Sequence, residues 1–316
     1  MIMEGKRLIE IDVMKGIFII LMVLCHLPYF VEKYTYVNNF VYSFHMYGFL
    51  LISGFLFNTE KDFKGFFTYF RYLFVPYLFF SSAYLISLYW ASSYISTANQ
   101  IQELSWSSWL NTIFQEPSGT YWYIHTIIIC SIIAYFSTRL FKSNENRFVL
   151  TSIFFMIISI VIPFQKPLFL FFYFVGYVIR LYRHSFDSII MKTWALIVPL
   201  IICSYSSDEA MRSVPTVVCN TFCVMGLIGW ITPRLWKPVL KAVAWIGKNS
   251  LPILLISPAF TVATKFAIPY FSFDSTRLIW TIISVIFVVV GCLISAYLFD
   301  RLRLSVFLCG RNLVNM

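Results

Sequence analysis

The chain of 316 residues is 59% hydrophobic, 20% aromatic and only 12% charged, with a mean hydropathy of +0.78 and a formal net charge of +10. These values exclude an ordinary soluble globular protein and are typical of a polytopic membrane protein. The positive charge indicates a topology signal and attraction to membrane lipid, and it does not indicate nucleic acid as a partner.

Runs of about twenty apolar residues predict an all-α bundle of about ten transmembrane helices. We expect a single membrane domain over residues 1–316 with no soluble domain. The first apolar run continues too long for a cleavable signal peptide, so it is expected to remain as an anchor. The predicted spans are 11–30, 39–57, 68–91, 121–141, 147–163, 167–182, 189–205, 214–232, 243–264 and 277–299.

The distribution of basic residues predicts the orientation of these spans. With ten spans and a cytoplasmic N-terminus, nineteen of the 24 Lys and Arg residues fall on the cytoplasmic side. Such an excess of Lys and Arg is typical of cytoplasmic loops. We therefore expect both termini in the cytoplasm. The outer side receives only Lys33, Lys166, Arg212, Lys265 and Arg277.

The first span carries ionisable residues at an unusual depth. Taken as one helix, it places Lys15 and His26 on nearly the same face, about 16 Å apart along the axis, with Asp12 one turn before Lys15. Such groups cost about 2 kcal/mol or more near hydrocarbon and usually face a bundle interior or a wet cavity. Asp12 and Lys15 therefore either belong to a site or anchor the helix at the cytoplasmic headgroups. For His26 the alternatives are a site and a packing role at the far interface.

The second span runs antiparallel to the first and places His45 at a depth similar to that of His26. The two histidines, on adjacent helices, are consistent with one shared cavity in the outer half of the membrane. Gly48 and Gly54 in the same span predict close approach of helix backbones, which is a packing role.

The longest connection, residues 92–120, contains Trp106 and Trp109. Its aromatic residues indicate either a helix in the membrane interface or a lid over an outer cavity, and the interfacial helix is the favoured interpretation. The seven cysteines are interpreted as small apolar packing residues. Cys219 and Cys223 lie four residues apart without another soft ligand nearby, so we expect no metal site.

Two sequence elements stand out, IDVMKGIFIILMVLCH at residues 11–26 and FHMYGFLLISGFLF at residues 44–57. Together they resemble the acyltransferase-3 family of integral membrane O-acyltransferases, especially its stand-alone members that acetylate bacterial surface sugars. Weaker elements extend the resemblance in chain order over nearly the whole chain. They are Arg71 with Pro76 and Tyr77, GTYWY at 119–123, Phe174 to Tyr177 with Arg180, and Gly247 to Leu251.

The resemblance implies transfer of an acetyl group from acetyl-CoA, a co-substrate and not a bound cofactor, to a carbohydrate hydroxyl. The acceptor would be a bacterial surface polysaccharide such as O-antigen, capsule or exopolysaccharide, and the enzyme would lie in the inner membrane. It implies His26 as the catalytic base, because imidazole titrates near neutral pH. His45 would orient His26, stabilise an oxyanion or bond the sugar.

The resemblance also implies contacts with the two substrates. Lys15, Arg71 and Lys248 are expected to meet the phosphates of CoA. For Arg71 and Lys248 the alternative is a cytoplasmic charge that fixes orientation. The expected substrate contacts are Asp12, Trp122, Tyr123, Asn249 and Ser250, although Trp122 and Tyr123 also fit an outer aromatic belt.

A transporter or flippase of a lipid-linked sugar or acyl donor is the competing interpretation, because ten helices and intramembrane charges suit it as well. The paired histidines and the lack of a convincing internal repeat favour the enzyme. A purely structural subunit is disfavoured by so many ionisable groups near one face.

Overall fold

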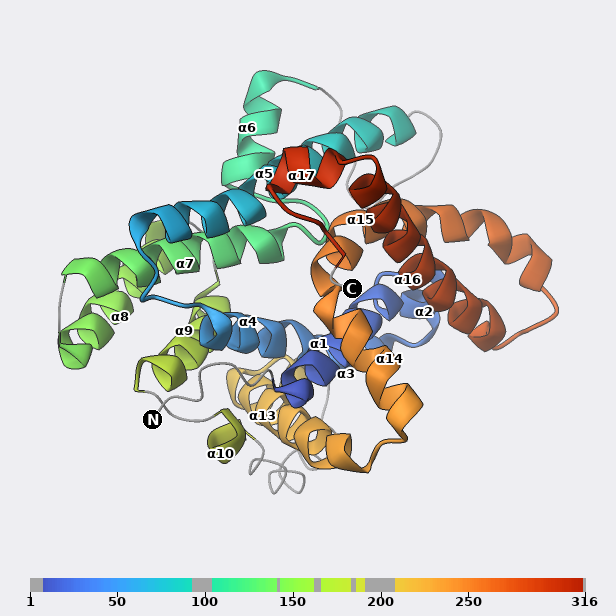
Figure 1. Cartoon of the computed structure of the whole chain (residues 1–316). Helices are drawn as coiled ribbons and strands as arrows, with labels where there is room; N and C mark the ends of the chain where they lie inside the picture. The colour runs from blue at the N-terminus through green and yellow to red at the C-terminus, as the bar shows by residue number, and fades with distance from the viewer. Residues whose placement is uncertain are drawn as a thin grey trace. The chain divides into compact units, whose positions relative to one another are not determined.

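The computed structural model of the chain describes residues 8–92, 104–140, 143–161, 166–182, 186–190 and 208–314. These residues form helices and their connections and contain no strand, so the predicted all-α class is confirmed (Figure 1). The helices, in order, are α1 Ile9–Leu24, α2 Pro28–Lys33, α3 Thr35–Tyr42, α4 His45–Leu56, α5 Phe63–Ser92, α6 Trp106–Phe114, α7 Trp122–Leu140, α8 Asn144–Val161, α9 Pro167–Leu181, α10 Phe186–Ile190, α12 Asp208–Met211, α13 Val214–Ile231, η2 Thr232–Arg234, α14 Lys237–Lys248, α15 Ser250–Ala263, η3 Thr264–Phe271, α16 Leu278–Arg301 and α17 Leu304–Cys309.

Within the described residues, six helical segments are long and apolar enough to cross a membrane. They contain α5, α7, α8, α13, α15 and α16, and α9 is a shorter apolar helix. The chain is therefore a multi-pass membrane protein, whereas the number of ten spans stays a prediction. The predicted span 189–205 lies almost entirely outside the described residues.

The first two predicted spans are each interrupted, and the expectation of one continuous helix in each is wrong. α1 ends at Leu24, and Leu27 has an extended backbone with φ −82° and ψ 110°. Leu27 precedes Pro28, and a residue before proline is sterically driven out of the helical region. The second span is interrupted at Ser43 and Phe44, between α3 and α4. Both histidines therefore lie at helix breaks.

The predicted span 243–264 also differs, because its first residues belong to α14 and the rest to α15. α14 begins with Lys237 and ends at Lys248, and Trp236 and Trp245 beside its lysines are exposed. Its buried residues Ala244 and Gly247 lie on one face, three apart. Hydropathy alone joins α14 to α15, because the apolar face of an amphipathic helix adds to the apolar run that follows.

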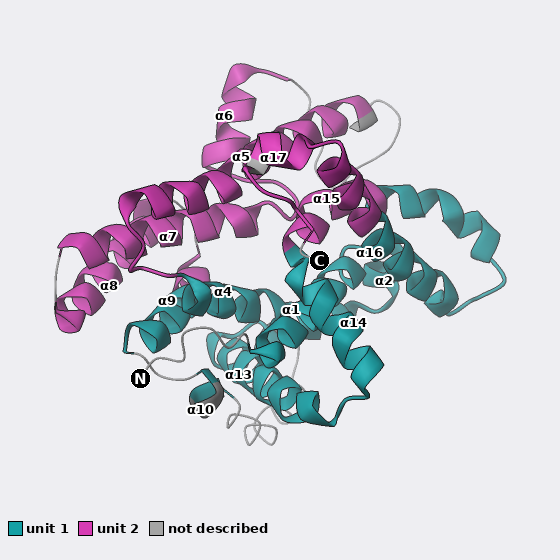
Figure 2. Ribbon diagram, viewed as in Figure 1, with its two compact units in different colours: residues 1–57, 171–250, 261–291 teal, residues 58–170, 251–260, 292–316 magenta. Residues whose placement is uncertain are grey.

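The described chain divides into two compact units (Figure 2). Unit 1 contains residues 1–57, 171–250 and 261–291, and unit 2 contains residues 58–170, 251–260 and 292–316. Both units are built from segments that lie far apart in the sequence. The assignment of residues 1–316 to a single domain stays a prediction.

In unit 1, α1 and α14 cross with their backbones in contact. A Cβ atom at Gly247 would lie 1.8 Å from the carbonyl oxygen of Asp12, and one at Gly16 would lie 2.1 Å from that of Val243. Only glycine allows this approach, as in other membrane helix pairs. The order of these contacts shows that the two helices run antiparallel.

Glycines also set the packing of α4 in unit 1. A Cβ atom at Gly54 would meet the carbonyl oxygen of Tyr173 at 2.0 Å, and one at Gly176 would meet that of Leu51 at 1.9 Å, so α4 and α9 cross as closely as α1 and α14. The predicted backbone approach at Gly54 is confirmed. Gly48 instead makes room for the ring of Phe18, 2.4 Å from its Cβ position.

In unit 2, α5 packs against α6, α7 and α17. The predicted helix in the long outer connection is present as α6, whereas residues 93–103 of that connection lie outside the described residues. Trp106, Leu110 and Phe114, spaced by four, are exposed on α6, at 80%, 48% and 49%. Such an exposed apolar stripe fits the predicted position in the membrane interface.

Candidate functional site

The two helix breaks in unit 1 each hold a histidine that bonds the carbonyl four residues earlier. His26 follows α1, and its Nδ1 lies 2.7 Å from the carbonyl oxygen of Met22. His45 begins α4, and its Nδ1 lies 2.7 Å from the carbonyl oxygen of Val41. A helix end leaves carbonyls without intrahelical partners. At the first break, His26 N–H bonds Val23 instead of Met22, so the imidazole supplies the donor that the Met22 carbonyl lacks. At the second break, the Val41 carbonyl accepts from the N–H of Phe44 at 3.2 Å and from the imidazole of His45.

These two bonds decide the tautomer of each ring. A carbonyl oxygen only accepts, so Nδ1 of His26 and of His45 carries the proton and donates it. In a neutral imidazole the other nitrogen, Nε2, is then the acceptor. Both rings thus present a basic Nε2 atom, and neither Nδ1 is available to take another proton.

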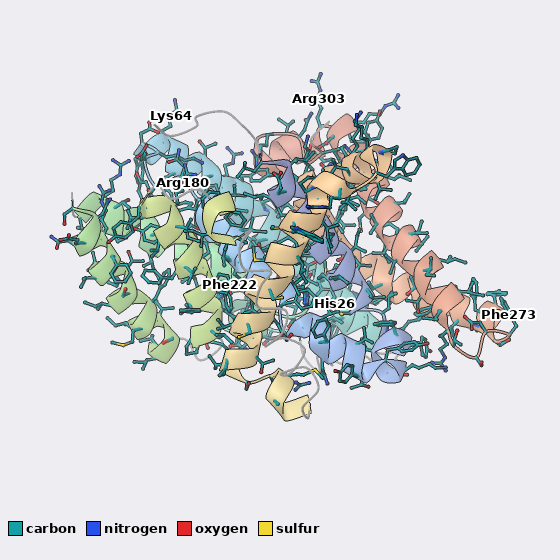
Figure 3. The ribbon with its side chains drawn as sticks, turned by 90° about the horizontal axis from the view of Figure 1, so that it is seen from below. His26, Lys64, Arg180, Phe222, Phe273 and Arg303 are labelled. Atoms are coloured by element: carbon teal, nitrogen blue, oxygen red, sulfur yellow. The ribbon has the colours of Figure 1, made fainter. Side chains whose placement is uncertain are left out.

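The structure brings the two histidines together, as the sequence predicted. The ring of Tyr42 neighbours both, with its centroid 6.4 Å from that of His26 and 5.1 Å from that of His45. His45 is fully buried, whereas His26 is partly exposed. The accessible Nε2 therefore belongs to His26. Figure 3 labels His26 on the blue N-terminal part of the chain.

A buried polar cluster adjoins His45 and is missed by sequence reasoning. The Nδ2 group of Asn220, on α13, donates to Oγ of Ser43 at 2.7 Å, and α13 packs against both α1 and α4. Asn38 and Asn39 lie about one turn before Ser43, and Nη2 of Arg212 donates to Oδ1 of Asn39 at 3.0 Å. The signal available in the sequence is an asparagine within the otherwise apolar span 214–232, because such residues usually face a bundle interior.

The second group of predicted site residues lies where α1 crosses α14. Gly247 contacts the backbone of Asp12 and Gly16 on α1. Lys248 and Asn249 follow Gly247 in the chain, and Lys15 precedes Gly16, so these residues adjoin the crossing. Asp12 is buried, and both lysines are half-buried. Nδ2 of Asn249 donates to the carbonyl oxygen of Trp245 at 2.9 Å and thereby caps α14. Ser250, buried, begins α15.

Lys15 and His26 are not on one continuous helix as predicted, but His26 bonds a residue on the face of α1 that carries Lys15. Lys15 lies seven residues before Met22, about 11 Å along the axis and on the same face of α1. His26 reaches Met22 from beyond the helix end through its Nδ1 bond. A basic group and an imidazole are therefore associated with one stripe of α1, although they do not share a single continuous helix.

Arg71, Trp122 and Tyr123 belong to unit 2, whereas the other predicted site residues belong to unit 1. Arg71 is exposed on α5. Trp122 stacks on Phe169 with ring centroids 4.4 Å apart, and Tyr123 is buried. Their predicted contacts with CoA and with an acceptor stay predictions.

The GTYWY element that contains Trp122 has a structural function in unit 2. Pro258 lies inside α15 and has no N–H for the carbonyl of Leu254, four residues earlier. The hydroxyl of Thr120 donates to that oxygen at 3.1 Å, and the hydroxyl of Tyr121 donates to the carbonyl of Leu255 at 2.9 Å. Gly119, with φ +63°, makes the turn that places them.

His125, on α7, supports α6. Its Nε2 lies 3.2 Å from the carbonyl oxygen of Phe114, and the hydroxyl of Tyr77 donates to that of Ile113 at 2.7 Å. Both carbonyls lie at the C-terminal end of α6. We assign His125 and Tyr77 to helix anchoring. His184 lies outside the described residues.

In the part of the chain that the structure describes, no three His, Cys, Asp or Glu residues come together as metal ligands require. Cys25, Cys130, Cys219, Cys223 and Cys292 are free thiols. The absence of a metal in the reaction stays a prediction.

A model of a known protein family, described as an acyltransferase domain, matches residues 8–297. No curated protein and no solved structure matches the chain. The matched range includes both histidine breaks, the crossing of α1 with α14 and the GTYWY element.

Proposed function

The chain belongs to the acyltransferase family whose domain model covers residues 8–297, and on that basis we propose that it transfers an acetyl group from acetyl-CoA to a carbohydrate hydroxyl. The acceptor is a bacterial surface polysaccharide or its lipid-linked precursor, and the enzyme works in the inner membrane. The observation that carries this proposal is the pair of imidazoles whose Nδ1–H groups are held by Met22 and Val41.

His26 is the proposed base, because its Nε2 is basic and its side chain is partly exposed. Nε2 takes the proton of the acceptor hydroxyl as the hydroxyl oxygen attacks the thioester carbonyl carbon. A C–O bond forms, the C–S bond breaks, and the proton on His26 passes to the departing CoA thiolate. General base catalysis by a positioned imidazole contributes roughly 10²- to 10⁴-fold to the rate.

His45 has the same tautomer, and its Nε2 is buried. We propose that His45 binds the acceptor or holds the neighbouring groups in place, because it is fully buried and its ring contacts that of Tyr42. The bond from Nδ1 to Val41 fixes the ring plane, so its Nε2 points in one direction. A fixed acceptor atom of this kind orients a hydroxyl for reaction.

Lys15 and Lys248 are proposed to bind the phosphates of the donor. They adjoin the tight crossing of α1 and α14, and two ammonium groups there attract a polyanion. Asp12, Asn249 and Ser250 lie in the same segment and are proposed to shape the donor site.

The test compares surface glycan from cells that carry the intact gene, a deletion, or the variant His26→Ala. We expect the deletion and the variant both to remove a base-labile acetyl group, measured by mass spectrometry before and after mild alkali. Equal amounts of variant and wild-type protein in the membrane, measured by immunoblot, are the control.

A transporter gives a different result. The glycan would then keep its acetyl groups in every strain and accumulate on the wrong side of the membrane. That outcome would overturn acyl transfer.

A further inference from the structure

Three buried polar atoms belong to residues near the second helix break. They are Oδ1 of Asn38, Nε2 of His45 and Oδ1 of Asn220. Asn38 and His45 flank the break in the chain, and Asn220 bonds Ser43 at the break. All three side chains are at least nine-tenths buried, and none of the three atoms has a hydrogen-bond partner among the described residues. They belong to α3, α4 and α13 of unit 1.

The hydrogen bonds around these atoms fix which of them accept. The hydroxyl of Ser43 donates to the carbonyl of Phe40 at 2.7 Å, so its oxygen must accept from Nδ2 of Asn220. That bond sets the amide orientation and leaves Oδ1 of Asn220 as the free end. Nε2 of His45 is an acceptor because the Nδ1 atom of that ring holds the proton. Both atoms therefore need a donor.

A buried polar atom without a partner is costly, so groups of this kind are kept where a ligand or water satisfies them. The partner must be a hydrogen-bond donor, since an acceptor cannot satisfy another acceptor. A sugar carries several hydroxyl groups, each with an O–H donor. The reactive end of a thioester carries only a carbonyl oxygen, which accepts, and no donor.

We propose that Asn220, together with Asn38 and His45, forms the hydroxyl-binding site of the acceptor, and that Asn220 determines how the acceptor is bound. The inference rests on the proposed function and adds to it the site that receives the alcohol. Asn220 acts by positioning: its Oδ1 accepts from one acceptor hydroxyl while another hydroxyl meets the histidines. The donor binds elsewhere, where α1 crosses α14.

The experiment uses the full-length protein in nanodiscs, with acetyl-CoA and a panel of methyl hexopyranosides as acceptors. For the glycoside that the wild type acetylates, we expect Asn220→Ala to raise the acceptor KM about tenfold, the loss of a buried hydrogen bond. The KM for acetyl-CoA should not change. Asn38→Ala, a second variant outside α13, should shift the same parameter in the same direction.

Thr221→Val is the matched control, because Thr221 is also fully buried on α13 and its hydroxyl bonds only the carbonyl of Val217 within the helix. We expect this variant to keep both KM values. An unchanged acceptor KM in Asn220→Ala, or an equal rise in the KM for acetyl-CoA, would overturn the inference.

A second readout separates this inference from the proposed function. Saturation-transfer NMR measures binding of the same methyl glycosides without turnover. If the wild type transfers no acetyl group but binds a glycoside, and Asn220→Ala abolishes that binding, acyl transfer fails and the hydroxyl site stands. If the wild type binds no glycoside, or Asn220→Ala binds it as well as the wild type, the site is overturned.

Discussion

Two places in this protein where a helix lacks a backbone hydrogen bond are compensated by side chains in different ways. At the end of α1 in unit 1, the imidazole of His26 bonds the carbonyl of Met22. In α15, in its unit 2 segment, the hydroxyls of Thr120 and Tyr121 bond the carbonyls of Leu254 and Leu255. Both sets of hydrogen bonds satisfy carbonyl oxygens of buried residues, and the hydrocarbon region of a membrane provides no water for such atoms. They differ in whether the side chain that donates the bond keeps a basic atom.

A hydroxyl that donates its single proton to a carbonyl retains only a weakly basic oxygen, so the bonds from Thr120 and Tyr121 to α15 are structural. An imidazole that donates from Nδ1 retains a basic nitrogen on its other side. The breaks at His26 and His45 therefore satisfy the backbone and present a reactive atom at the same time. We predict that substitution of His26 abolishes catalysis, whereas substitution of Thr120 or Tyr121 lowers stability and leaves catalysis nearly unchanged.

The largest effect is expected for His26→Asn. Asn249 already shows that an asparagine amide can donate to the carbonyl four residues earlier, so the variant can keep the bond to Met22 while it loses the base. We expect acetyl transfer by purified protein to fall by roughly 10²- to 10⁴-fold. The midpoint of thermal unfolding should stay close to that of the wild type.

His26→Ala is the control for this prediction. It should lose transfer as fully and also lower the free energy of unfolding by about 1–3 kcal/mol, because the carbonyl of Met22 loses its partner. Transfer near the wild-type rate in His26→Asn would remove His26 as the base.

The bonds to α15 near Pro258 should respond in the opposite way. Thr120→Val and Tyr121→Phe each leave a carbonyl of α15 without its donor and should lower the free energy of unfolding by about 1–3 kcal/mol. Acetyl transfer per folded molecule should change by less than about threefold. Unfolding is followed by intrinsic fluorescence and transfer by release of the CoA thiol. A loss of transfer without destabilisation would place this element in the catalytic site.

A smaller effect is expected from a double-mutant cycle between Thr120 and Pro258. Pro258→Ala provides an N–H for the carbonyl of Leu254, so Thr120→Val should cost less in that background than in the wild type. We expect a coupling free energy of about 1 kcal/mol, obtained from the unfolding free energies of the four proteins. Additive effects would show that the hydroxyl does not replace the missing backbone bond.

The smallest effect is expected at a helix start, where N–H groups need an acceptor. The carboxylate of Asp274 accepts from the hydroxyl of Thr276 at 2.5 Å and from the N–H of Ile279 at 2.9 Å, before α16. The Thr276 hydroxyl, and then the backbone N–H of Ile279, lower the pKa of this carboxyl. Because the pKa is lowered on folding, the stabilisation is complete above the unfolded pKa, about 3.9, and is lost as the pH falls through the folded value.

Asp274→Asn measures this contribution. The wild type should have the higher unfolding midpoint at pH 7, and the difference between the two proteins should disappear as the pH falls below about 3.9. A difference that stays constant between pH 7 and pH 3 would show that ionisation of Asp274 does not contribute. Asp274 is partly exposed, so the effect should also be weaker in high salt.

Much of the fold could be predicted from the sequence because apolar length is a strong signal. The predicted spans 68–91, 121–141, 214–232 and 277–299 correspond to α5, α7, α13 and α16 within several residues. The first two predicted spans failed where hydropathy ignores local stereochemistry. Pro28 ends the helical stretch that precedes it, and its position in the sequence was sufficient to predict a break. The break at Ser43 has no such signal.

The candidate site could be predicted in part. The juxtaposition of His26 with His45 follows from two adjacent antiparallel helices, which sequence order supports. Sequence reasoning misses Asn220, because an asparagine 175 residues from His45 shows its relation to Ser43 only after the chain folds. The contacts of Trp122 and Tyr123 with a sugar stay predictions. Their neighbours Thr120 and Tyr121 donate hydrogen bonds to carbonyls of α15.

Composition and local motifs are sufficient to identify an α-helical membrane protein of the acyltransferase family, because both are properties of short stretches of chain. Which nitrogen of each histidine is basic depends instead on the folded structure. At each helix break Nδ1 donates to a carbonyl, of Met22 or of Val41, and Nε2 is left without a proton. The contact of Asp12 with Gly247, and the bond that joins Asn220 to the histidine region, have the same origin. Hydrogen bonds and backbone contacts between distant segments form only when helices pack, and one-dimensional periodicity does not encode them.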